Sequence, residues 1–549
     1  MGDWDGRQRA DLAAAGLLIV FATLCVHGML RKSATFDEMV YVASGYSYLE
    51  TGDFRMHREA PPLIPTLSGI ALEALGAFVP IGFSTDGPDW EEAREYAFAR
   101  RFFHEDNSRG FLMLTAARVP IVLLGVLLGL GIYRFGKLLF GAPAGLLALT
   151  VFSLDPNMIA HSRIVSADLG LALFFLLSHY FLYAALTSLS VRPVILMSLS
   201  VALVLSVKFS GLLVLPSLAL LALVTWLRPP TAILDSLSAS APAYRQRLLR
   251  LSLMGLLLSV AATFLLLSIL YHGLDAFSRY YEGIKLIYWN RLPGYRFYML
   301  GEFREKAWPY YYQIAFLLKT PVPTLILGLL SAVLWRRVAG GITKTLFLIV
   351  PFLIVHLAAT QDTANLGLRR VIACYPFLFV AIGSLAARSR PAGLRRDPRA
   401  LLVGGFLVAL GVSAVMIHPH QLSFFNLIAG GPENGYRHLA DSDIDWGQDL
   451  PSLAALADEE RWGEIGLSYF GTDDPGSYGI RWRPIREEEW ARPRPGVYAV
   501  SVRNLIYNKL AAEKLGRPEM DWLARHAPTA RAGYSIYVYD FRGTGENAR

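Results

Sequence analysis

The run DLAAAGLLIVFATLCVHGML, residues 11–30, is long and apolar enough to cross a bilayer as a helix. No small-residue cleavage site precedes Arg31 and Lys32, so we interpret the run as a retained anchor rather than a signal peptide. Directly behind it stands ATFDEMVYVASGYSYLETGDFRMHREAPPL, residues 34–63, which crowds carboxylates, a histidine and a Pro-Pro pair into one loop. An ordinary connection needs none of these groups, so this loop is the first candidate for function.

Composition extends the membrane assignment to the whole chain. Of its 549 residues, 54% are hydrophobic and only 17% are charged, whereas a soluble chain carries roughly a quarter charged residues. Both cysteines, Cys25 and Cys374, fall inside apolar runs, which excludes a disulfide framework or a thiolate metal site. The net charge of +8 comes mainly from short loops between apolar runs, so we expect no nucleic-acid partner.

Apolar segments of spanning length recur along the first three quarters of the chain. At about 1.5 Å of rise per residue, these segments predict about eleven transmembrane helices. The predicted spans are 12–30, 115–135, 141–159, 167–187, 193–208, 211–227, 249–271, 322–335, 345–360, 371–387 and 401–418.

Basic residues orient these spans. With the N-terminus inside, every loop rich in Lys and Arg falls on the cytoplasmic side, which satisfies the positive-inside rule. The residues concerned are Arg7, Arg9, Arg134, Lys137, Arg192, Arg228, Arg245, Arg247, Arg250, Arg336, Arg337, Lys344, Arg388, Arg390, Arg395, Arg396 and Arg399. We therefore expect a multi-pass protein of the plasma (inner) membrane with a cytoplasmic N-terminus and an extracytoplasmic C-terminus.

Three regions then face the outside. In the membrane domain, 1–418, these are a first outer loop at 31–114 and a large outer loop at 272–320. The tail, 419–549, has the pattern of a small α/β domain. Its predicted strands are EIGLSYFG, GVYAVSV and YSIYVYDF, and its predicted helix is QDLPSLAALADEERW. The predicted fold class is an all-α polytopic membrane protein with a small extracytoplasmic α/β domain at its C-terminus.

The acidic pair of the first outer loop has a structural and a chemical interpretation. Thr35 and Glu38 match a capping box, and Gly52 suits the end of a helix over 36–50. The cap accounts for Glu38 but only partly for Asp37, and it does not account for GDFRMHREAPPL behind the helix. Outward loops often carry function, so both interpretations stay open.

Ionisable residues also stand at the outer ends of later spans. The cations are Arg163, Lys208, Arg369 and Arg370, and Asp168 begins the fourth span. Charges at a membrane face are costly and indicate function by default. A local ion pair of Arg163 with Asp168 and snorkelling of the cations are the structural alternative. Gathered together, these groups would suit an anionic lipid headgroup with acid-base chemistry beside it.

The large outer loop adds aromatic and ionisable groups. Its many Trp and Tyr residues suit an interfacial aromatic belt, but they also offer flat faces for sugar rings. The belt does not explain Glu302 or the Lys319-Thr320-Pro321 entry to the next span. We count Glu302 and Lys319 among the candidate substrate-binding residues.

Four motifs follow one another along the membrane domain: FDEMVYVASGYSYLETGDF with EAPPL, RIVSADLGLALF, KFSG and FLLKTPVPTLILGLL. In this order they resemble the GT-C glycosyltransferases that use lipid-carrier donors. The nearest resemblance is to bacterial relatives of protein O-mannosyltransferases and to aminoarabinose transferases of lipid A, and it covers about residues 12–418. The tail motif HPHQLSFFNLIAGGPENGYRHLADSDIDWGQDL is similar to a subgroup with no assigned acceptor.

The resemblance implies roles for individual residues. Asp37 takes the place of the catalytic carboxylate, a general base, with Glu38 beside it and Asp168 as the acidic residue of the second outer loop. Lys208 and the pair Arg369 and Arg370 stand where relatives gather cations around a lipid phosphate.

Further candidates surround this predicted centre. Some relatives bind a divalent metal, and His57 and Glu59 could serve as ligands, although they form no clear metal motif; we leave the metal open. His57, Glu59 and Arg163 are also candidates for substrate binding, together with the two residues of the large outer loop.

The predicted activity is transfer of a sugar from a polyprenyl-phosphate donor to a hydroxyl acceptor on the outer membrane face, with inversion. The acceptor could be a protein, a lipid or a glycan, and membrane lipids are the surroundings. Two alternatives stay open: a transporter or flippase of lipid-linked sugars, and a surface-polysaccharide polymerase or ligase. A transporter would place ionisable groups near the bilayer midplane and often shows inverted repeats.

Overall fold

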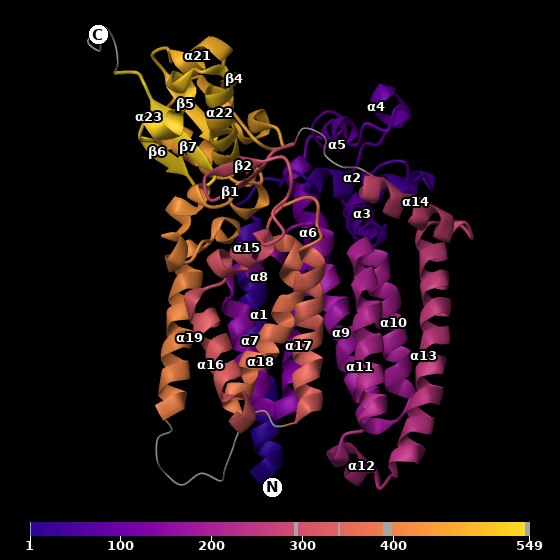
Figure 1. The fold of residues 1–549 in the computed structure, drawn as a ribbon. Coiled ribbons are helices and arrows are strands. Elements are labelled where there is room, and N and C mark those ends of the chain that lie inside the picture. Colours follow the sequence, from indigo (N-terminus) through magenta and orange to yellow (C-terminus); the bar gives the residue numbers. More distant parts are fainter. Residues whose placement is uncertain (1, 290–294, 339–340, 388–397, 544–549) are drawn as a thin grey trace.

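A computed structural model describes residues 2–289, 295–338, 341–387 and 398–543. Long helices run side by side and form a bundle, and a small sheet covers one of its ends (Figure 1). The basic residues Arg388, Arg390, Arg395 and Arg396 lie outside the described residues.

Every predicted span coincides with a helix of the bundle. The hydrophobic runs become helices because a backbone in lipid has to satisfy its hydrogen bonds internally. The helices are α1 (Gly2–Met29), α6 (Gly110–Phe140), α7 (Ala142–Leu154), α9 (Ala167–Ser188), α10 (Val191–Val207), α11 (Val214–Leu227), α13 (Ala241–Leu270), α16 (Val322–Val338), α17 (Ile342–Ala359), α18 (Tyr375–Gly383) and α19 (Pro398–Ile417).

Not all of these helices have full spanning length. Within the described residues, eight helical segments are long and apolar enough to cross a membrane. A ninth would consist of α15 (Tyr311–Lys319) and α16, which are bent by 108° at the break between them. Helices α7 and α10 are apolar but shorter. The chain is therefore a multi-pass membrane protein, and the count of eleven includes short and bent helices.

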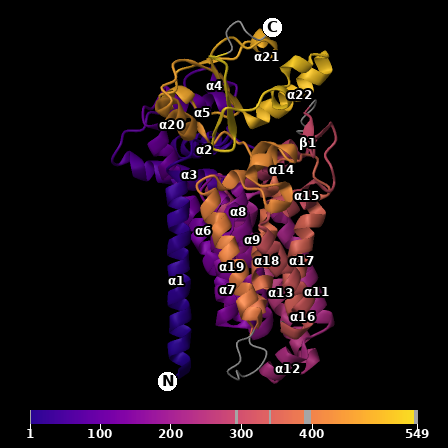
Figure 2. The same cartoon turned by 90° about the vertical axis from the view of Figure 1, so that its left-hand side faces the viewer.

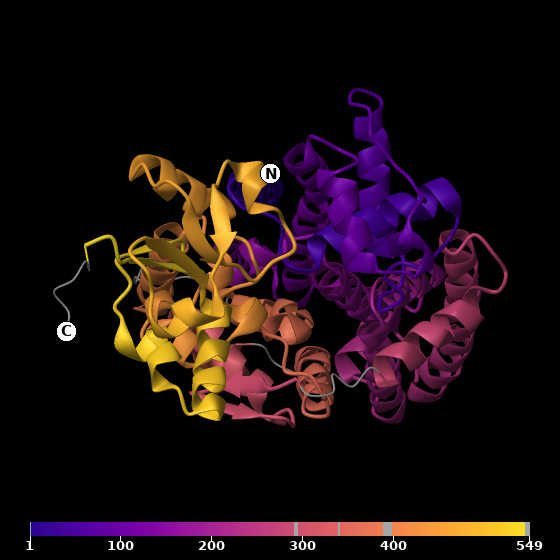
Figure 3. The same ribbon diagram turned by 90° about the horizontal axis from the view of Figure 1, so that it is seen from above.

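The three predicted outer regions gather at one end of the bundle, opposite the N-terminus (Figures 1 and 2), and we call this end the outer end after the prediction. The first region contributes α2 (Glu38–Thr51), α3 (Leu63–Gly76), α4 (Pro88–Glu91) and α5 (Glu95–His104). The large outer region contributes α14 (Ala276–Trp289) and a hairpin of β1 (Phe297–Met299) and β2 (Glu302–Arg304). Seen from above, α2 to α5 lie beside the C-terminal sheet (Figure 3).

The sheet confirms the predicted α/β character of the tail. Its strand order is β4-β3-β5-β7-β6, parallel among the first three strands and antiparallel in the rest. Strand β5 is buried along its whole length, as a central strand covered on both faces should be. The elements are α20 (Leu450–Glu459), β3 (Ile465–Ser468), β4 (Trp482–Pro484), β5 (Val497–Ser501), α22 (Val502–Leu515), β6 (Ala530–Ala532) and β7 (Ile536–Asp540).

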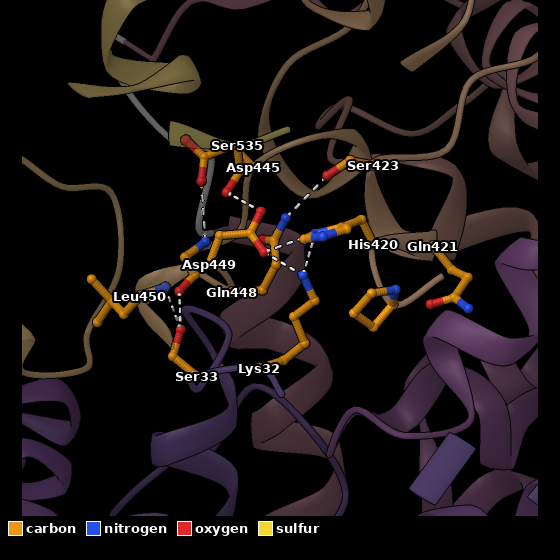
Figure 4. A network of polar contacts seen from close by, with 12 residues as sticks. Lys32, Ser33, His420, Gln421, Ser423, Asp445, Gln448, Asp449, Leu450 and Ser535 are labelled. Carbon is orange, nitrogen blue, oxygen red and sulfur yellow. Dashed lines mark hydrogen bonds and ion pairs between the residues drawn. The ribbon is translucent and has the colours of Figure 1, made fainter. Parts of the chain in front are cut away.

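A buried polar network attaches this tail to the end of α1 (Figure 4). Lys32 forms an ion pair with Asp449, and His420 lies 3.4 Å from the same carboxylate. Ser535 of the sheet region donates a hydrogen bond of 2.8 Å to Asp449. Burial by itself would raise the pKa of Asp449, but Lys32 and His420 hold it well below its usual value. The tail is therefore fixed to the membrane helices by compensated charge.

The capping box at the start of α2 forms only in part. The helix begins at Glu38, whose carboxylate accepts a 2.8 Å hydrogen bond from the backbone N–H of Thr35. The Thr35 hydroxyl, however, has no hydrogen-bond partner among the described residues, so Thr35 does not cap the helix as predicted. The end of the helix matches the prediction, since Gly52 adopts φ 67° there.

Glu38 instead forms a buried ion pair with Arg118 of α6. Arg118 donates two hydrogen bonds to the carboxylate, of 2.9 and 2.6 Å, and both side chains are almost completely buried. The remaining guanidinium hydrogens point at the chain that leaves α1. They bond to the backbone carbonyls of Met29, Lys32 and Ser33. This pair holds α1, α2 and α6 together at the outer end of the bundle.

We predict that Glu38→Gln lowers the thermal stability of the detergent-solubilised protein strongly. The substitution keeps the volume but leaves the Arg118 charge buried without a counter-charge, which costs about 3–5 kcal/mol. Glu302→Gln is the matched control, because its ion pair with Arg304 is exposed. Equal melting temperatures for the two variants would contradict the structural role of Glu38.

Candidate active site

Four charged side chains from separate elements meet at the outer end of the bundle. Asp37 immediately precedes α2, and Asp168 lies in the first turn of α9. Lys208 stands between α10 and η1 (Phe209–Leu213), and Arg369 lies on η2 (Leu368–Cys374), which leads into α18. Segments more than 300 residues apart in sequence thus contribute to one cluster.

Arg369 bridges the two carboxylates of this cluster. One of its guanidinium nitrogens lies 3.3 Å from Asp37 and 3.8 Å from Asp168. Lys208 lies 2.5 Å from the other oxygen of Asp168. Two negative and two positive charges therefore balance, as buried charges require.

The members of the cluster differ in their access to solvent. The Asp168 side chain is 1% exposed, whereas those of Asp37 and Lys208 are each 23% exposed. Asp168 is therefore suited to hold the cations in place, and Asp37 and Lys208 can reach a bound molecule.

Asp37 lies in an environment that makes it a stronger base than an ordinary aspartate. Burial raises the pKa of Asp37, opposed by the charges of Arg369 and His57, while Asp441 and Asp168 raise the pKa further. The net effect is a pKa above the ordinary value. Such a carboxylate is suited to accept a proton.

His57 stands beside Asp37 at the rim of a cavity. Its ring packs on Tyr41 with 4.3 Å between the centroids, and its Nδ1 lies 3.3 Å from Glu95. The cavity has a volume of about 480 Å³. Its lining consists of Tyr48, Asp53, Phe54, Arg55, His57, Arg58, Ala60, Pro62, Glu91, Glu92, Ala93, Tyr271, Arg279, Glu282 and Gly283. Glu59 is exposed in the same loop as His57.

The structure gives no set of metal ligands around His57 and Glu59. Throughout the described part of the chain, no group of three or more His, Cys, Asp and Glu side chains could hold a metal ion.

The two adjacent arginines of η2 have different partners. Arg370 lies 3.2 Å from Asp362, which also accepts a 2.9 Å hydrogen bond from the Tyr312 hydroxyl. The ion pairs of Arg369, by contrast, are with Asp37 and Asp168. Neighbouring residues on a helical turn point in different directions, so only Arg369 reaches the carboxylates.

Arg163 does not form the predicted ion pair with Asp168. Its guanidinium donates to the Pro419 carbonyl at 2.7 Å and to the Gln421 side chain at 2.9 Å. It therefore connects the loop before α9 with the chain that follows α19. This position is a correction to the proposed local ion pair.

Lys319 and Glu302 also lie apart from the cluster around Asp37. Lys319 is buried and donates to the carbonyls of Leu422 and Asp443. The Glu302 side chain is 68% exposed on the β1–β2 hairpin. The buried contacts of Lys319, like those of Glu38, hold segments of the outer end together, whereas Glu302 lies exposed and away from the cluster.

Sequence analysis missed the contribution of the tail to this cluster. The Trp446 ring lies 4.3 Å from the Arg369 guanidinium carbon, and Asp441 acts electrostatically on both Asp37 and Arg369. The motif HLADSDIDWGQDL contains both Asp441 and Trp446. Its high density of Asp was the available signal, but nothing in its spacing connects it with Asp37.

The fold and the cluster define a multi-pass membrane protein with two carboxylates and two cations paired at one end of its helical bundle. Residues 109–241 match the family model of dolichyl-phosphate-mannose-protein mannosyltransferases. This segment contains Asp168 and Lys208. The resemblance to lipid-carrier glycosyltransferases is thus confirmed over this part of the chain.

Solved structures with a similar chain arrangement include ArnT from Cupriavidus metallidurans bound to undecaprenyl phosphate. The sequence identity is 13% and the TM-score 0.47, over 96% of this chain and 97% of that chain. The apo state of the same protein has a sequence identity of 13% and a TM-score of 0.48, over 97% of this chain and 98% of that chain. The S. cerevisiae Pmt1–Pmt2 protein O-mannosyltransferase complex bound to the sugar donor has a sequence identity of 18% and a TM-score of 0.33, over 50% of this chain and 34% of that chain. No curated protein matches the chain.

We predict that Asp37→Asn changes the melting temperature at pH 7 far less than Glu38→Gln does, because the lost ion pair with Arg369 and the relieved burial of charge oppose each other. A carboxyl whose pKa is raised on folding destabilises the fold when it is ionised, and stability increases as pH falls through the raised pKa. The neutral amide removes this cost while the helix start tolerates Asn. Thermal unfolding at pH 7 and at pH 5 is the measurement, with a smaller pH effect expected in the variant. A fall as large as that of Glu38→Gln would contradict the assignment.

Proposed function

We propose that this protein is a GT-C glycosyltransferase that moves a sugar from a polyprenyl-phosphate donor to a hydroxyl acceptor. The observation that carries the proposal is Arg369 between Asp37 and Asp168, with Lys208 on the same cluster. In the proposal, Asp37 acts as a base beside these cations at the outer membrane face. The mannosyltransferase match over 109–241 supports the same chemistry.

Asp37 is the general base of the proposed reaction. The acceptor hydroxyl gives its proton to the Asp37 carboxylate while the hydroxyl oxygen attacks the anomeric carbon of the donor sugar. The new C–O bond forms as the bond from that carbon to the phosphate oxygen breaks, so direct displacement inverts the configuration. The 23% exposure of the Asp37 side chain leaves it accessible to an acceptor.

Lys208 and Arg369 stabilise the leaving group. The lipid phosphate regains negative charge as the sugar departs, and preorganised cations in a partly dry site lower the energy of that charge. Asp168 positions both cations through its ion pairs. Arg370, paired with Asp362, contributes to the positive field around the same site.

The location of the site suits a donor whose tail lies in the bilayer. We propose that the N-terminus is cytoplasmic and the tail extracytoplasmic at the plasma membrane, because loops rich in Lys and Arg then lie inside. Nucleotide sugars are not available outside the cell, so an enzyme at that face needs a lipid-linked donor. We further propose that the chain divides into a catalytic membrane domain, 1–418, and an extracytoplasmic domain, 419–549. The acceptor is a protein, a lipid or a glycan.

A transporter of lipid-linked sugars is the alternative from another class. Its ionisable groups would lie near the bilayer midplane. The cluster around Asp37 lies instead at the ends of helices, at the start of α9 and after α10. This position favours the transferase.

We predict that the purified protein transfers sugar from a polyprenyl-phosphate donor and that Asp37→Asn abolishes turnover while donor binding persists. The wild-type rate should fall as pH decreases through the Asp37 pKa, because the protonated carboxyl cannot accept a proton. Near-normal turnover of Asp37→Asn would falsify the general-base role.

Mass spectrometry of surface glycoconjugates from a deletion strain and its parent identifies the sugar and acceptor.

We predict that Lys208→Ala and Arg369→Ala each weaken donor use by roughly ten- to a hundredfold, since a charge-assisted bond contributes about 1.5–3 kcal/mol. Arg370→Ala should have a smaller effect because its ion pair is with Asp362. Arg304→Ala, on the exposed hairpin, is the control. The measurement is donor titration in nanodiscs, and unaltered donor dependence in both main variants rules out phosphate binding by this cluster.

A further inference from the structure

We propose that Asp443 and Trp446 are positioning residues that hold Arg369 against Asp37, which makes the tail segment 441–446 a part of the active site. The inference rests on the proposed function for its catalytic meaning. The contacts that carry it come from three separate points of the segment.

Asp443 fixes the start of η2, the turn that presents Arg369. Its side chain is 1% exposed, and one oxygen accepts a 2.9 Å hydrogen bond from the backbone N–H of Leu368. The other oxygen accepts a 2.8 Å hydrogen bond from the Tyr311 hydroxyl, and Lys319 lies 3.9 Å away. Full satisfaction of a buried carboxylate defines its position. The backbone one residue before Arg369 is thereby fixed.

Ser442 packs closely against the loop that leads into η2. Its hydroxyl donates a 2.9 Å hydrogen bond to the Leu366 carbonyl, which also accepts a 3.2 Å bond from Arg369. Gly367 lies between, at φ +88°, and a Cβ there would stand 2.2 Å from the Ser442 hydroxyl. The loop before Arg369 is therefore shaped to receive the tail segment.

Trp446 contacts Arg369 and the residue that directly precedes Asp37. Its ring supports the Arg369 guanidinium at 4.3 Å, and its backbone carbonyl accepts a 2.8 Å hydrogen bond from the N–H of Phe36, the residue before Asp37. The ring is buried, so the cation–π attraction acts with little water around it. One residue of the tail thus sets the position of the base and of the cation.

This arrangement explains the tail's buried attachment to the membrane domain. Asp449 and Lys32 fix the chain three residues beyond Trp446 (Figure 4). Gln448 accepts a 2.8 Å hydrogen bond from the Trp446 N–H. A domain that only covered the bundle would not need charge compensation at this point. The tail acts as a rigid support for the reacting groups.

The test compares Trp446→Leu with Trp522→Leu in full-length protein. Both tryptophans are buried in the tail, but the Trp522 ring packs among Trp490, Tyr498 and Phe541. We expect Trp446→Leu to raise the KM for the polyprenyl-phosphate sugar by about tenfold. Trp522→Leu should lower the melting temperature and leave KM unchanged. Trp446→Phe, which keeps an aromatic face, should recover part of the loss.

The pH profile supplies a readout that loss of packing alone would not move. The groups that act on Asp37 are Arg369, His57, Asp441 and Asp168. Displacement of Arg369 removes a charge that lowers the Asp37 pKa, so the acidic limb of the rate profile should shift to higher pH in Trp446→Leu. Asp443→Asn should shift it in the same direction.

The two proposals fail in different ways. An active wild type in which Trp446→Leu and Trp522→Leu have the same KM and pH profile overturns the positioning role alone. A wild type without transfer from any donor overturns the transferase. In that case a thermal double-mutant cycle of Trp446→Leu with Arg369→Gln tests the contact itself. Additive melting-temperature changes would refute the positioning role, and non-additive changes would support it.

Discussion

The ion pair of Arg118 with Glu38 is the interaction on which the outer end of the molecule depends. A buried guanidinium has five N–H donors to satisfy, and Arg118 divides them between one carboxylate and three backbone carbonyls. Glu38 further accepts a 2.9 Å hydrogen bond from the Val165 N–H, which attaches the loop before α9. Because Asp37 directly precedes Glu38, this network sets where the proposed base stands relative to Asp168.

The same physical constraint organises the rest of the outer end. Charges removed from water have to be paired, and the chain pairs them across long sequence separations. Asp449 with Lys32 attaches the tail, while Arg369 connects Asp37 to Asp168. Arg369, the cation that faces the proposed base, therefore depends on contacts from the tail. The helical bundle and the tail are joined by these buried contacts.

Much of the architecture could be predicted because it follows from local physics. A run such as 11–30 has to become a helix in lipid, and a short apolar run such as 497–501 is typical of a buried strand. The irregular positions were harder to predict. Thr35 fits a capping pattern, yet its hydroxyl is not used, because the backbone N–H of Glu38 bonds to the Thr35 carbonyl instead. The Glu38 carboxylate still accepts from the Thr35 N–H while it pairs with Arg118, so a local cap and a tertiary ion pair share one side chain.

The sequence by itself determined the order of the apolar helices, the α/β tail, and the first outer loop with Asp37 as a candidate. Only the tertiary structure decided which charges meet. Arg369 rather than its neighbour Arg370 faces Asp37, Arg163 contacts Gln421 instead of Asp168, and Trp446 supports the cation from the tail. The physical reason is that hydrophobic periodicity is written locally, whereas the pairing of buried charges depends on how distant helix ends pack.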